Sequence, residues 1–340
     1  MIRGDGASEQ MRACLRKLGE FGLIERIKRG GRSRGRNILL GIGDDAAAFR
    51  LSPGHVGSAT TDTLVEGTHF DPRYTGFHDL GWKAMAANLS DIAAMGGRPL
   101  MALVSLTLTG RQSVKDVDDL YRGMRALAGR FAVDIAGGDI VRGRELSVTI
   151  TVIGECRKGN LGLRSGARPG DAVLVTGTLG GSRAGLQLIN SKLITKNAKL
   201  LIKHLRPEPR VREALALAGS FRLHGMIDIS DGLASELHHL ARESEVGIAI
   251  DRGALPVSPE ALAVAGKLGQ DPAGYCLYGG EDYELLFTLP RRDAIKAKAL
   301  MRKLGTQCTV IGQASAGRGV RLTGRNGRSV SLAGSGYRHF

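Results

Sequence analysis

The chain has 340 residues, of which 42% are hydrophobic and 24% are charged, and this length and composition predict two globular domains and exclude a disordered or fibrous protein. Its net charge of +15 lies at the two ends: residues 1–36 carry 10 basic and 4 acidic side chains, residues 291–340 carry 11 and 1, and the part between them has a net charge of −1. Because the basic run Arg26–Arg36 has no interleaved aromatic residues, the charge indicates solvated flanks, and nucleic acid is not expected as a partner.

The cysteines and the hydropathy pattern indicate the cellular compartment. The four cysteines occur singly, without the paired spacing of a metal site or a redox motif. No apolar stretch reaches the roughly 18 residues needed to cross a bilayer, and the N-terminus lacks an apolar signal segment. These features predict a cytoplasmic protein with reduced thiols and no membrane association.

The first half of the chain alternates between strand and helix patterns. Strands are indicated where apolar and polar residues alternate, and helices where apolar residues recur every three or four positions. Ser113 followed by Asp116 is typical of a helix start. Strands are expected at 39–42, 46–51, 56–61, 101–109, 132–136 and 145–153, and helices at 80–95 and 114–131.

The second half begins after a segment without periodicity. Residues 157–169 are rich in glycine and arginine, which predicts a linker. Beyond it, strands are expected at 171–176, 226–229 and 283–289, helices at 182–190, 211–218, 232–244 and 291–304, and short strands from 308 onward. The expected division is an extension at 1–18, disordered or loosely helical, an N-terminal domain at 19–156, the linker at 157–169, and a C-terminal domain at 170–340.

Carboxylates recur in five clusters, four of them beside glycine or threonine near expected strand ends and one, Asn88 with Asp91, on one face of the helix expected at 80–95. The five clusters are Gly43-Asp44-Asp45, Thr60-Thr61-Asp62-Thr63, Asn88 with Asp91, Gly137-Gly138-Asp139, and Asp228-Ile229-Ser230-Asp231-Gly232. Oxygen ligands without histidine or cysteine suit Mg²⁺, which binds carboxylates, waters and substrate phosphates. A single cluster of this kind more often caps a helix or closes a turn. Five together favour a metal site for phosphate chemistry.

The usual phosphate-binding loops are missing. The sequence has no G-x-x-x-x-G-K-[S/T] motif and no protein-kinase motifs, and Gly177–Gly181 does not have the spacing of a dinucleotide fingerprint. Several Mg²⁺ ions held by aspartates can neutralise a triphosphate instead, with Arg164 as a further phosphate donor. The residues therefore predict a metal-dependent nucleotide site and leave its substrate open.

Six motifs, in this order and spacing, resemble those of the thiamine-monophosphate kinase family. They are GIGDDA at 41–46, TDTLVEGTHF at 61–70, NLSDIAAMG at 88–96, GGD at 137–139, DISDGL at 228–233 and GGEDYEL at 279–285. The match covers nearly the whole chain beyond residue 18. It implies an α+β protein with two α/β-sandwich domains of the aminoimidazole-ribonucleotide synthetase-like type, and a homodimer whose N-terminal sheets pack together.

The same resemblance implies the reaction and the roles of individual residues. The implied reaction is phosphorylation of thiamine phosphate by ATP to give thiamine diphosphate, with several Mg²⁺ ions as cofactors. Mg²⁺ would be held by Asp45, Thr60, Thr61, Asp62, Asp91, Asp139, Asp228 and Asp231. ATP would be bound by Gly138, Asp139, Arg164 and Ser230, and thiamine phosphate by His69, Glu281 and Tyr337. The residues expected to be catalytic are Asp62, Asp91, Asp139 and Asp231.

Two alternatives stay open at this point. A related ATP-dependent synthetase of the aminoimidazole-ribonucleotide or selenophosphate type is one, although the selenophosphate enzyme is expected to carry a reactive cysteine near its N-terminus, and only Cys14 is available. A non-catalytic nucleotide-binding protein is the other, but it would be expected to have lost carboxylates that are all present here. One departure from the family pattern is that Ile140 and Val141 follow Asp139 where threonines are common, which removes a candidate hydroxyl contact to the nucleotide.

Overall fold

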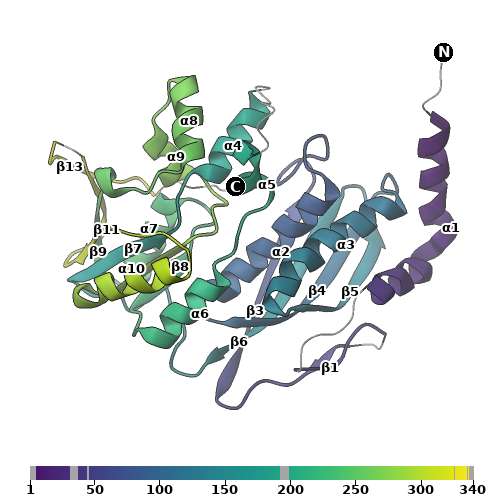
Figure 1. Cartoon of the computed structure of the whole chain (residues 1–340), viewed down its shortest axis with the longest axis horizontal. Coiled ribbons are helices and arrows are strands. Elements are labelled where there is room, and N and C mark those ends of the chain that lie inside the picture. The colour runs from purple at the N-terminus through teal and green to yellow at the C-terminus, as the bar shows by residue number, and fades with distance from the viewer. Residues whose placement is uncertain are drawn as a thin grey trace. The chain divides into compact units, whose positions relative to one another are not determined.

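The structure is a computed structural model of the chain, and it describes residues 5–30, 37–43, 46–191, 199–324, 326–334 and 336 (Figure 1). Two predicted site residues, Asp45 and Tyr337, lie outside the described residues. The chain divides into two compact units: unit 1 is Met1–Asn88 with Pro99–Glu155, and unit 2 is Leu89–Arg98 with Cys156–Phe340. Each unit combines a β-sheet with helices, so the predicted α+β class is confirmed.

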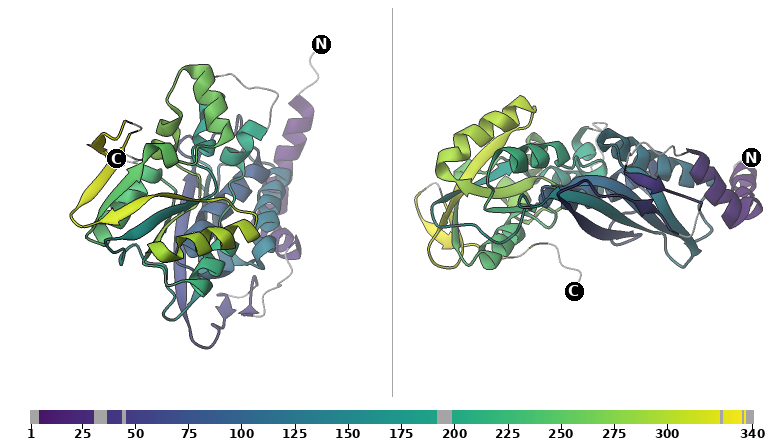
Figure 2. Two further views of the ribbon diagram at one scale, coloured as in Figure 1. Left: turned by 60° about the vertical axis from the view of Figure 1, so that its left-hand side comes forward. Right: turned by 90° about the horizontal axis from the view of Figure 1, so that it is seen from below.

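Unit 1 contains a four-stranded sheet with two helices on one face, as Figures 1 and 2 show. In sheet order the strands are β3 (His55–Val65), β6 (Ser147–Arg157), β4 (Arg98–Leu108) and β5 (Asp134–Arg142), and the two helices are α2 (Phe77–Ala94) and α3 (Val114–Ala128). The remaining elements are α1 (Asp5–Gly30), which is kinked at Gly19, a small sheet of β1 (Ile38–Leu40) and β2 (Ala48–Phe49), and the short 3₁₀ helix η1 (Gly129–Phe131).

Alternation of side chains along the strands gives this sheet one apolar and one polar face. In β6, Val148 and Ile150 are fully buried. Thr151 lies on the opposite face, because successive residues of a strand point to opposite sides, and it donates a hydrogen bond to Thr61 of β3 at 3.0 Å. The polar face therefore carries a row of threonine hydroxyls.

Helices α2 and α3 approach each other at two glycines. A Cβ atom on Gly81 would lie 2.0 Å from the carbonyl oxygen of Leu120, and one on Gly123 would lie 1.9 Å from that of His78. Real Cβ atoms essentially never come this close to another heavy atom. The packing of this helix pair therefore requires glycine at both positions.

We expect Gly123→Ala to lower the free energy of unfolding by about 3 kcal/mol, because the new methyl group meets backbone that can only move with its helix. Urea denaturation followed by circular dichroism measures the change. Gly266, inside α8 (Pro259–Leu268), has open space where a Cβ atom would lie, so Gly266→Ala serves as the control and should be neutral or stabilise by about 0.5–1 kcal/mol. Equal effects of the two substitutions would contradict the close approach.

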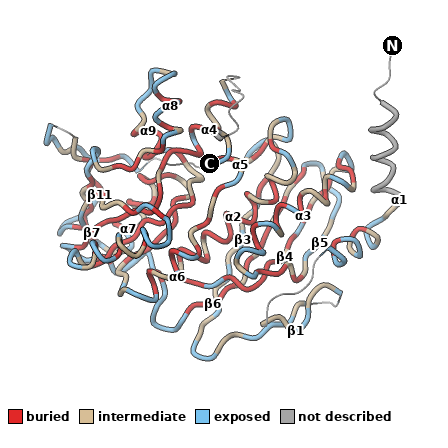
Figure 3. Tube along the Cα trace, viewed as in Figure 1, coloured by how far each residue is buried: buried red, intermediate tan, exposed pale blue. Residues whose placement is uncertain are grey.

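Unit 2 contains a seven-stranded sheet in which every neighbouring pair is antiparallel except β9 with β12. In sheet order its strands are β13 (Ser329–Ser331), β12 (Gly319–Thr323), β9 (Gly247–Asp251), β11 (Cys308–Ser315), β7 (Asp171–Thr176), β10 (Leu285–Pro290) and β8 (Gly225–Asp228). Its helices are α4 (Gly181–Asn190), α5 (Lys199–Leu205), α6 (Val211–Ser220), α7 (Leu233–Glu243), α8, α9 (Pro272–Tyr278) and α10 (Ala294–Lys303), with short 3₁₀ helices η2 (Arg252–Ala254) and η3 (Arg291–Asp293). All six residues of β7 are buried (Figure 3), so this strand forms the centre of the core.

Three predicted strands continue beyond their expected ends by four or more residues, and two of them carry acidic clusters. The strand expected at 145–153 is β6, which continues to Arg157. The strand expected to end at Thr61 continues as β3 to Val65, because Thr-Asp-Thr-Leu-Val keeps the alternation and pairs with β6. The strand expected at 132–136 is β5, which runs through the glycines of the GGD motif. A Cβ atom on Gly138 would lie 1.9 Å from the carbonyl oxygen of Val104, so glycine here permits close pairing with β4. Asp62 and Asp139 therefore lie within strands.

Other elements differ less from expectation. The strand at 171–176 and the capping box of Ser113 with Asp116 are confirmed. The helix expected at 291–304 is divided into η3 and α10, and the prediction omitted β9, α5, α8, α9 and the part of α1 beyond residue 18. Within the described part of the chain, no helix has both the length and the hydropathy that a bilayer span requires.

Candidate functional site

The Asp228–Gly232 segment forms the turn from β8 into α7 in unit 2. Asp228 is the last residue of β8 and only 3% exposed, and its Oδ2 accepts a hydrogen bond of 2.7 Å from the Ser90 hydroxyl. Gly232 has φ 110°, a conformation that few other residues adopt, and α7 begins directly after it. The turn thus places Asp231 just before α7, between the buried Asp228 and the N-cap Gly232 in the sequence.

Glu236 lies beside this acidic segment and belongs to none of the sequence motifs. It is 3% exposed, and its Oε1 accepts a hydrogen bond of 3.2 Å from the backbone N–H of Asp231. Burial, followed by the negative charge of Asp228, raises the pKa of Glu236 to about 8, while the backbone hydrogen bond from Asp231 and the positive charge of Arg164 act in the opposite direction. The sequence offered only a weak indication of a functional role for Glu236, because a glutamate in the first turn is common in helices of any function.

The Gly279–Leu285 motif lies along the same turn. The backbone N–H of Glu281 donates to the carbonyl oxygen of Ser230 at 2.7 Å, and that of Tyr283 donates to Ile229 at 2.9 Å. A Cβ atom on Gly280 would lie 2.6 Å from the Ser230 oxygen, so the two segments are too close for any other residue there. Two motifs 50 residues apart in the sequence therefore form one structural unit.

The side chains of this motif face different partners. Glu281 Oε2 lies 3.2 Å from Nδ1 of the buried His204, and the Glu281 side chain is 27% exposed. Asp282 accepts hydrogen bonds from the backbone N–H groups of Gly180 (2.7 Å) and Ser182 (3.3 Å) at the N-terminus of α4, and burial raises its pKa to about 7. Asp282 thus anchors the segment, and Glu281 retains access to solvent.

Unit 1 carries the second group of predicted residues. In β3, Thr60 and Asp62 are half-buried on one face, and Thr61 is exposed on the other, where it accepts the hydrogen bond from Thr151. The structure therefore separates Thr61 from the two residues with which it was grouped. Asp139 is exposed in β5, and its Oδ1 accepts from the N–H of Ile140 at 2.9 Å.

The loop after β3 fixes His69. The backbone N–H of Val65 donates to His69 Nδ1 at 3.0 Å, so the neutral ring carries its proton on Nε2. Glu66, in the same loop, accepts hydrogen bonds of 2.9 Å at both carboxylate oxygens from Arg111, which lies in the connection between β4 and α3. A surface cavity of about 500 Å³ is lined by Glu66, Gly67, Asp71, Pro72, Arg73 and Arg111.

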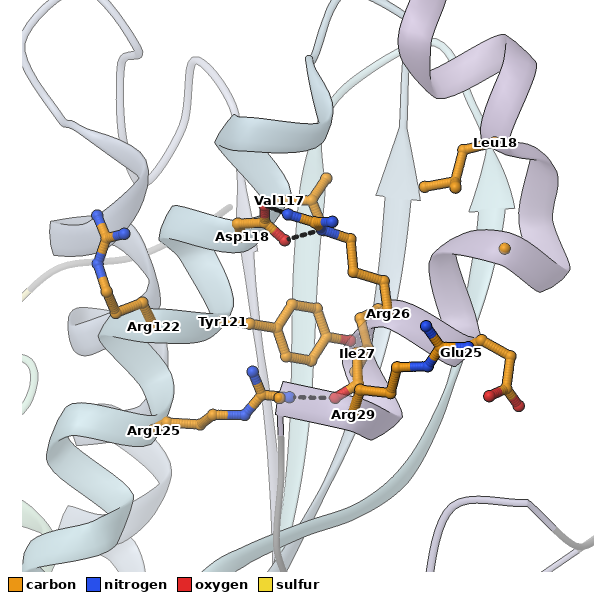
Figure 4. Close-up of a pocket in the computed structure, with 12 residues that line it drawn as sticks. Leu18, Glu25, Arg26, Ile27, Arg29, Val117, Asp118, Tyr121, Arg122 and Arg125 are labelled. Atoms are coloured by element: carbon orange, nitrogen blue, oxygen red, sulfur yellow. Dashed lines mark hydrogen bonds and ion pairs between the residues drawn. The ribbon is translucent and has the colours of Figure 1, made fainter.

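A larger cavity, of about 710 Å³, lies between α1 and α3 and contains none of the predicted site residues (Figure 4). Arg26 donates to both carboxylate oxygens of Asp118 at 2.7 Å, and Arg125 donates to the carbonyl oxygen of Ile27 at 2.5 Å. These contacts hold the C-terminal end of α1 on α3. The described part of the basic run therefore has a structural role, and residues 31–36 lie outside the described residues.

Comparisons with known proteins cover nearly the whole chain. Two family models match, AIR synthase related protein, N-terminal domain, at residues 43–156, and its C-terminal domain at residues 168–325. The thiamine-monophosphate kinase of Escherichia coli (strain K12) is 38% identical over 332 residues, which are 95% of this chain and 98% of that protein. The chain belongs to the thiamine-monophosphate kinase family. The family assignment and the expected reaction, phosphorylation of thiamine phosphate to thiamine diphosphate with ATP, are confirmed.

Solved structures of thiamine-monophosphate kinases have the same fold. That of Stenotrophomonas maltophilia superposes with a TM-score of 0.82 at 36% identity and covers 93% of this chain and 98% of its own. AaThiL complexed with AMPPCP and TMP gives a TM-score of 0.76 at 34% identity and covers 96% of this chain and 98% of its own. The hydrogenase maturation protein HypE in complex with ATP gives 0.75 at 22% identity, which shows a common fold alone.

The kinase family implies Mg²⁺, and the acidic residues suit this ion because their donor atoms are oxygens. Within the described ranges, no three histidine, cysteine or acidic side chains are close enough together to form a complete metal site. The donors are nevertheless all oxygens, and the buried Asp228 and Glu236 repel each other, which a cation would relieve. One turn before Asp91, the buried Oδ1 of Asn88 has no hydrogen-bond partner in the described structure. It is a free acceptor of the kind that a bound cation or its water would use.

Proposed function

We propose that this kinase transfers the terminal phosphoryl group of ATP directly and in line to the phosphate of thiamine phosphate. The observation that carries this proposal is the junction of two motifs at Ser230, which joins the acidic turn of Asp228 and Asp231 to the segment bearing Glu281. When bound, Mg²⁺ would cancel charge on the triphosphate and on the acceptor. The residues proposed to hold Mg²⁺ are Asp45, Thr60, Asp62, Asp91, Asp139, Asp228 and Asp231, with Asp62, Asp91, Asp139 and Asp231 most directly at the reacting phosphates. Thr61, which the resemblance also implied, is left out of this set because its side chain lies on the other face of β3 and is bonded to Thr151.

The other residues bind and orient the two substrates. Arg164 is exposed, and its charge acts on Glu236, so it can reach an anionic group beside the acidic turn. We assign Gly138, Asp139, Arg164 and Ser230 to ATP, and His69, Glu281 and Tyr337 to thiamine phosphate. The fixed tautomer of His69 makes its Nε2–H a donor, and the Glu281 carboxylate suits a cationic thiazolium or an aminopyrimidine.

The chain does not need a general base for this reaction. A phosphate monoester has its second pKa near ~6, so the acceptor is already largely a dianion at neutral pH. Alignment and charge cancellation are what the site must supply. A covalent aspartyl-phosphate is disfavoured, because carboxylates that hold cations are poor nucleophiles.

One labelling experiment tests the direct route. Protein incubated with Mg²⁺ and γ-labelled ATP should stay unlabelled until thiamine phosphate is added, and the label should then appear in thiamine diphosphate. Thiamine and aminoimidazole precursors serve as control acceptors and should receive no label. Stoichiometric label on the protein that is chased into product would overturn the direct mechanism, and transfer to a control acceptor would overturn the substrate.

We further propose a homodimer formed through the polar face of the unit 1 sheet. Its support is that β3 exposes Thr61 and Thr63 there, in a row that a second copy could cover. We also place the kinase in the cytoplasm. Among the residues whose side chains are described, Cys156, Cys276 and Cys308 are buried and form no disulfide, which suits a reducing compartment.

A further inference from the structure

A buried histidine contacts the Glu281 carboxylate, which we propose binds thiamine phosphate. His204 lies on α5 and is 4% exposed. Its Nδ1 lies 3.2 Å from Glu281 Oε2 and 3.1 Å from the Ser182 hydroxyl oxygen. His204 and Glu281 are 77 residues apart in the sequence, so only the fold brings them together.

These distances determine which ring nitrogen carries the proton. A carboxylate only accepts hydrogen bonds, so the nitrogen facing it is stabilised as N–H. Nδ1–H can then be shared between the Glu281 carboxylate and the Ser182 oxygen. A neutral ring with its lone pair on Nδ1 would instead oppose the charge of Glu281.

The backbone of Glu281 is fixed independently of this contact. Its N–H is bonded to Ser230, and the next residue, Asp282, is bonded to the backbone of Gly180 and Ser182. The remaining freedom of Glu281 is in its side chain, which has three rotatable bonds and is partly exposed. The histidine contact restricts that freedom.

We propose that His204 is a positioning residue, which holds the Glu281 carboxylate through Nδ1–H in the orientation that binds the cationic part of thiamine phosphate. This inference rests on the proposed role of Glu281. A flexible long side chain loses conformational entropy when it binds a ligand, and holding it in place beforehand reduces that loss. The expected consequence is tighter binding of thiamine phosphate, with little effect on ATP or on phosphoryl transfer itself.

Two amide substitutions test the proposal. The side-chain N–H₂ of His204→Asn can occupy the position of Nδ1, and that of His204→Gln the position of Nε2. We expect His204→Gln to raise KM for thiamine phosphate about tenfold, with kcat and KM for ATP unchanged, and His204→Asn to stay within about threefold of the wild type. Equal KM values for the two variants, or a fall in kcat alone, would overturn the inference.

The matched control is another buried histidine–carboxylate pair in the same unit. His224 Nδ1 lies 2.8 Å from Asp171 at the opposite end of β7, so His224→Gln breaks a similar contact away from Glu281. It should reduce stability without changing KM for thiamine phosphate, and an equal rise in KM would mean that the His204 effect is only structural.

Glu281→Gln separates this inference from the proposed function. If His204 acts through Glu281, adding His204→Gln to Glu281→Gln should cause no further rise in KM. If Glu281→Gln leaves KM unchanged, the positioning role fails. The labelling experiment on the wild-type protein decides the direct transfer reaction separately.

Discussion

Replacing Arg210 by methionine is expected to lower the free energy of unfolding by about 3–5 kcal/mol, because it leaves a buried carboxylate without its partner. Arg210 donates to Glu284 through Nη2 at 2.5 Å and Nε at 2.6 Å, and Glu284 is 1% exposed. Burial disfavours the charged guanidinium, but the Glu284 carboxylate outweighs this and raises the pKa of Arg210 above its ordinary value. The pair therefore stays ionised in the core.

Chemical denaturation of the variant measures the loss. An exposed ion pair provides the control: Arg242 donates to Glu243 at 3.0 Å, and both side chains are largely in solvent, so Arg242→Met should change stability by less than about 1 kcal/mol. Replacing both Arg210 and Glu284 by apolar residues should recover part of the loss. A change below about 1 kcal/mol for Arg210→Met would mean that Glu284 finds another partner.

The second large effect is expected on activity. Asp231→Asn should reduce kcat/KM by about 10²–10³-fold, the usual cost of removing one group that stabilises developing charge. Stability should change little or improve, because the substitution removes one of the charges that act on Glu236. Steady-state assays with a parallel thermal melt separate the two effects. Asp293, next to Arg292 at the start of α10, is the control, and Asp293→Asn should be fully active.

Removing Mg²⁺ should abolish the binding of ATP. The predicted aspartates repel one another and the triphosphate, so binding of ATP measured by calorimetry should disappear in EDTA and return when Mg²⁺ is added in excess. Undiminished ATP affinity in EDTA would contradict a cation-assembled site. Full activity of Asp231→Asn would remove that residue from it.

Local signals explain which parts of the fold could be predicted. The capping box of Ser113 and the apolar run of β7 are complete within a few residues, and both were placed correctly. The helices α8 and α9 also begin with a capping residue and proline, at Ser258 and Asp271, and these signals could have been used. The end of β3 could not be located in this way, because it depends on pairing with β6, whose residues lie more than 80 positions away.

For the site residues too, local sequence patterns could not show contacts between residues that are far apart in the chain. Motif order indicated Asp228, Asp231 and Glu281. Glu236 and His204 have no motif of their own, and their roles follow from burial against those residues, which only the folded chain defines. Sequence patterns thus identify the groups proposed to contact a substrate more readily than the groups that hold them in place.

The backbone at Glu281 and Tyr283 carries a cost that bears on the evolution of this enzyme. Both residues have positive φ values, 63° and 50°, in a region that glycine and asparagine occupy more easily. Selection for thermal stability alone would favour those smaller residues and would remove the carboxylate at 281. Under the role that we propose for Glu281, the binding contact offsets this cost, and we expect a laboratory lineage evolved for heat resistance without an activity screen to replace the glutamate and to lose affinity for thiamine phosphate.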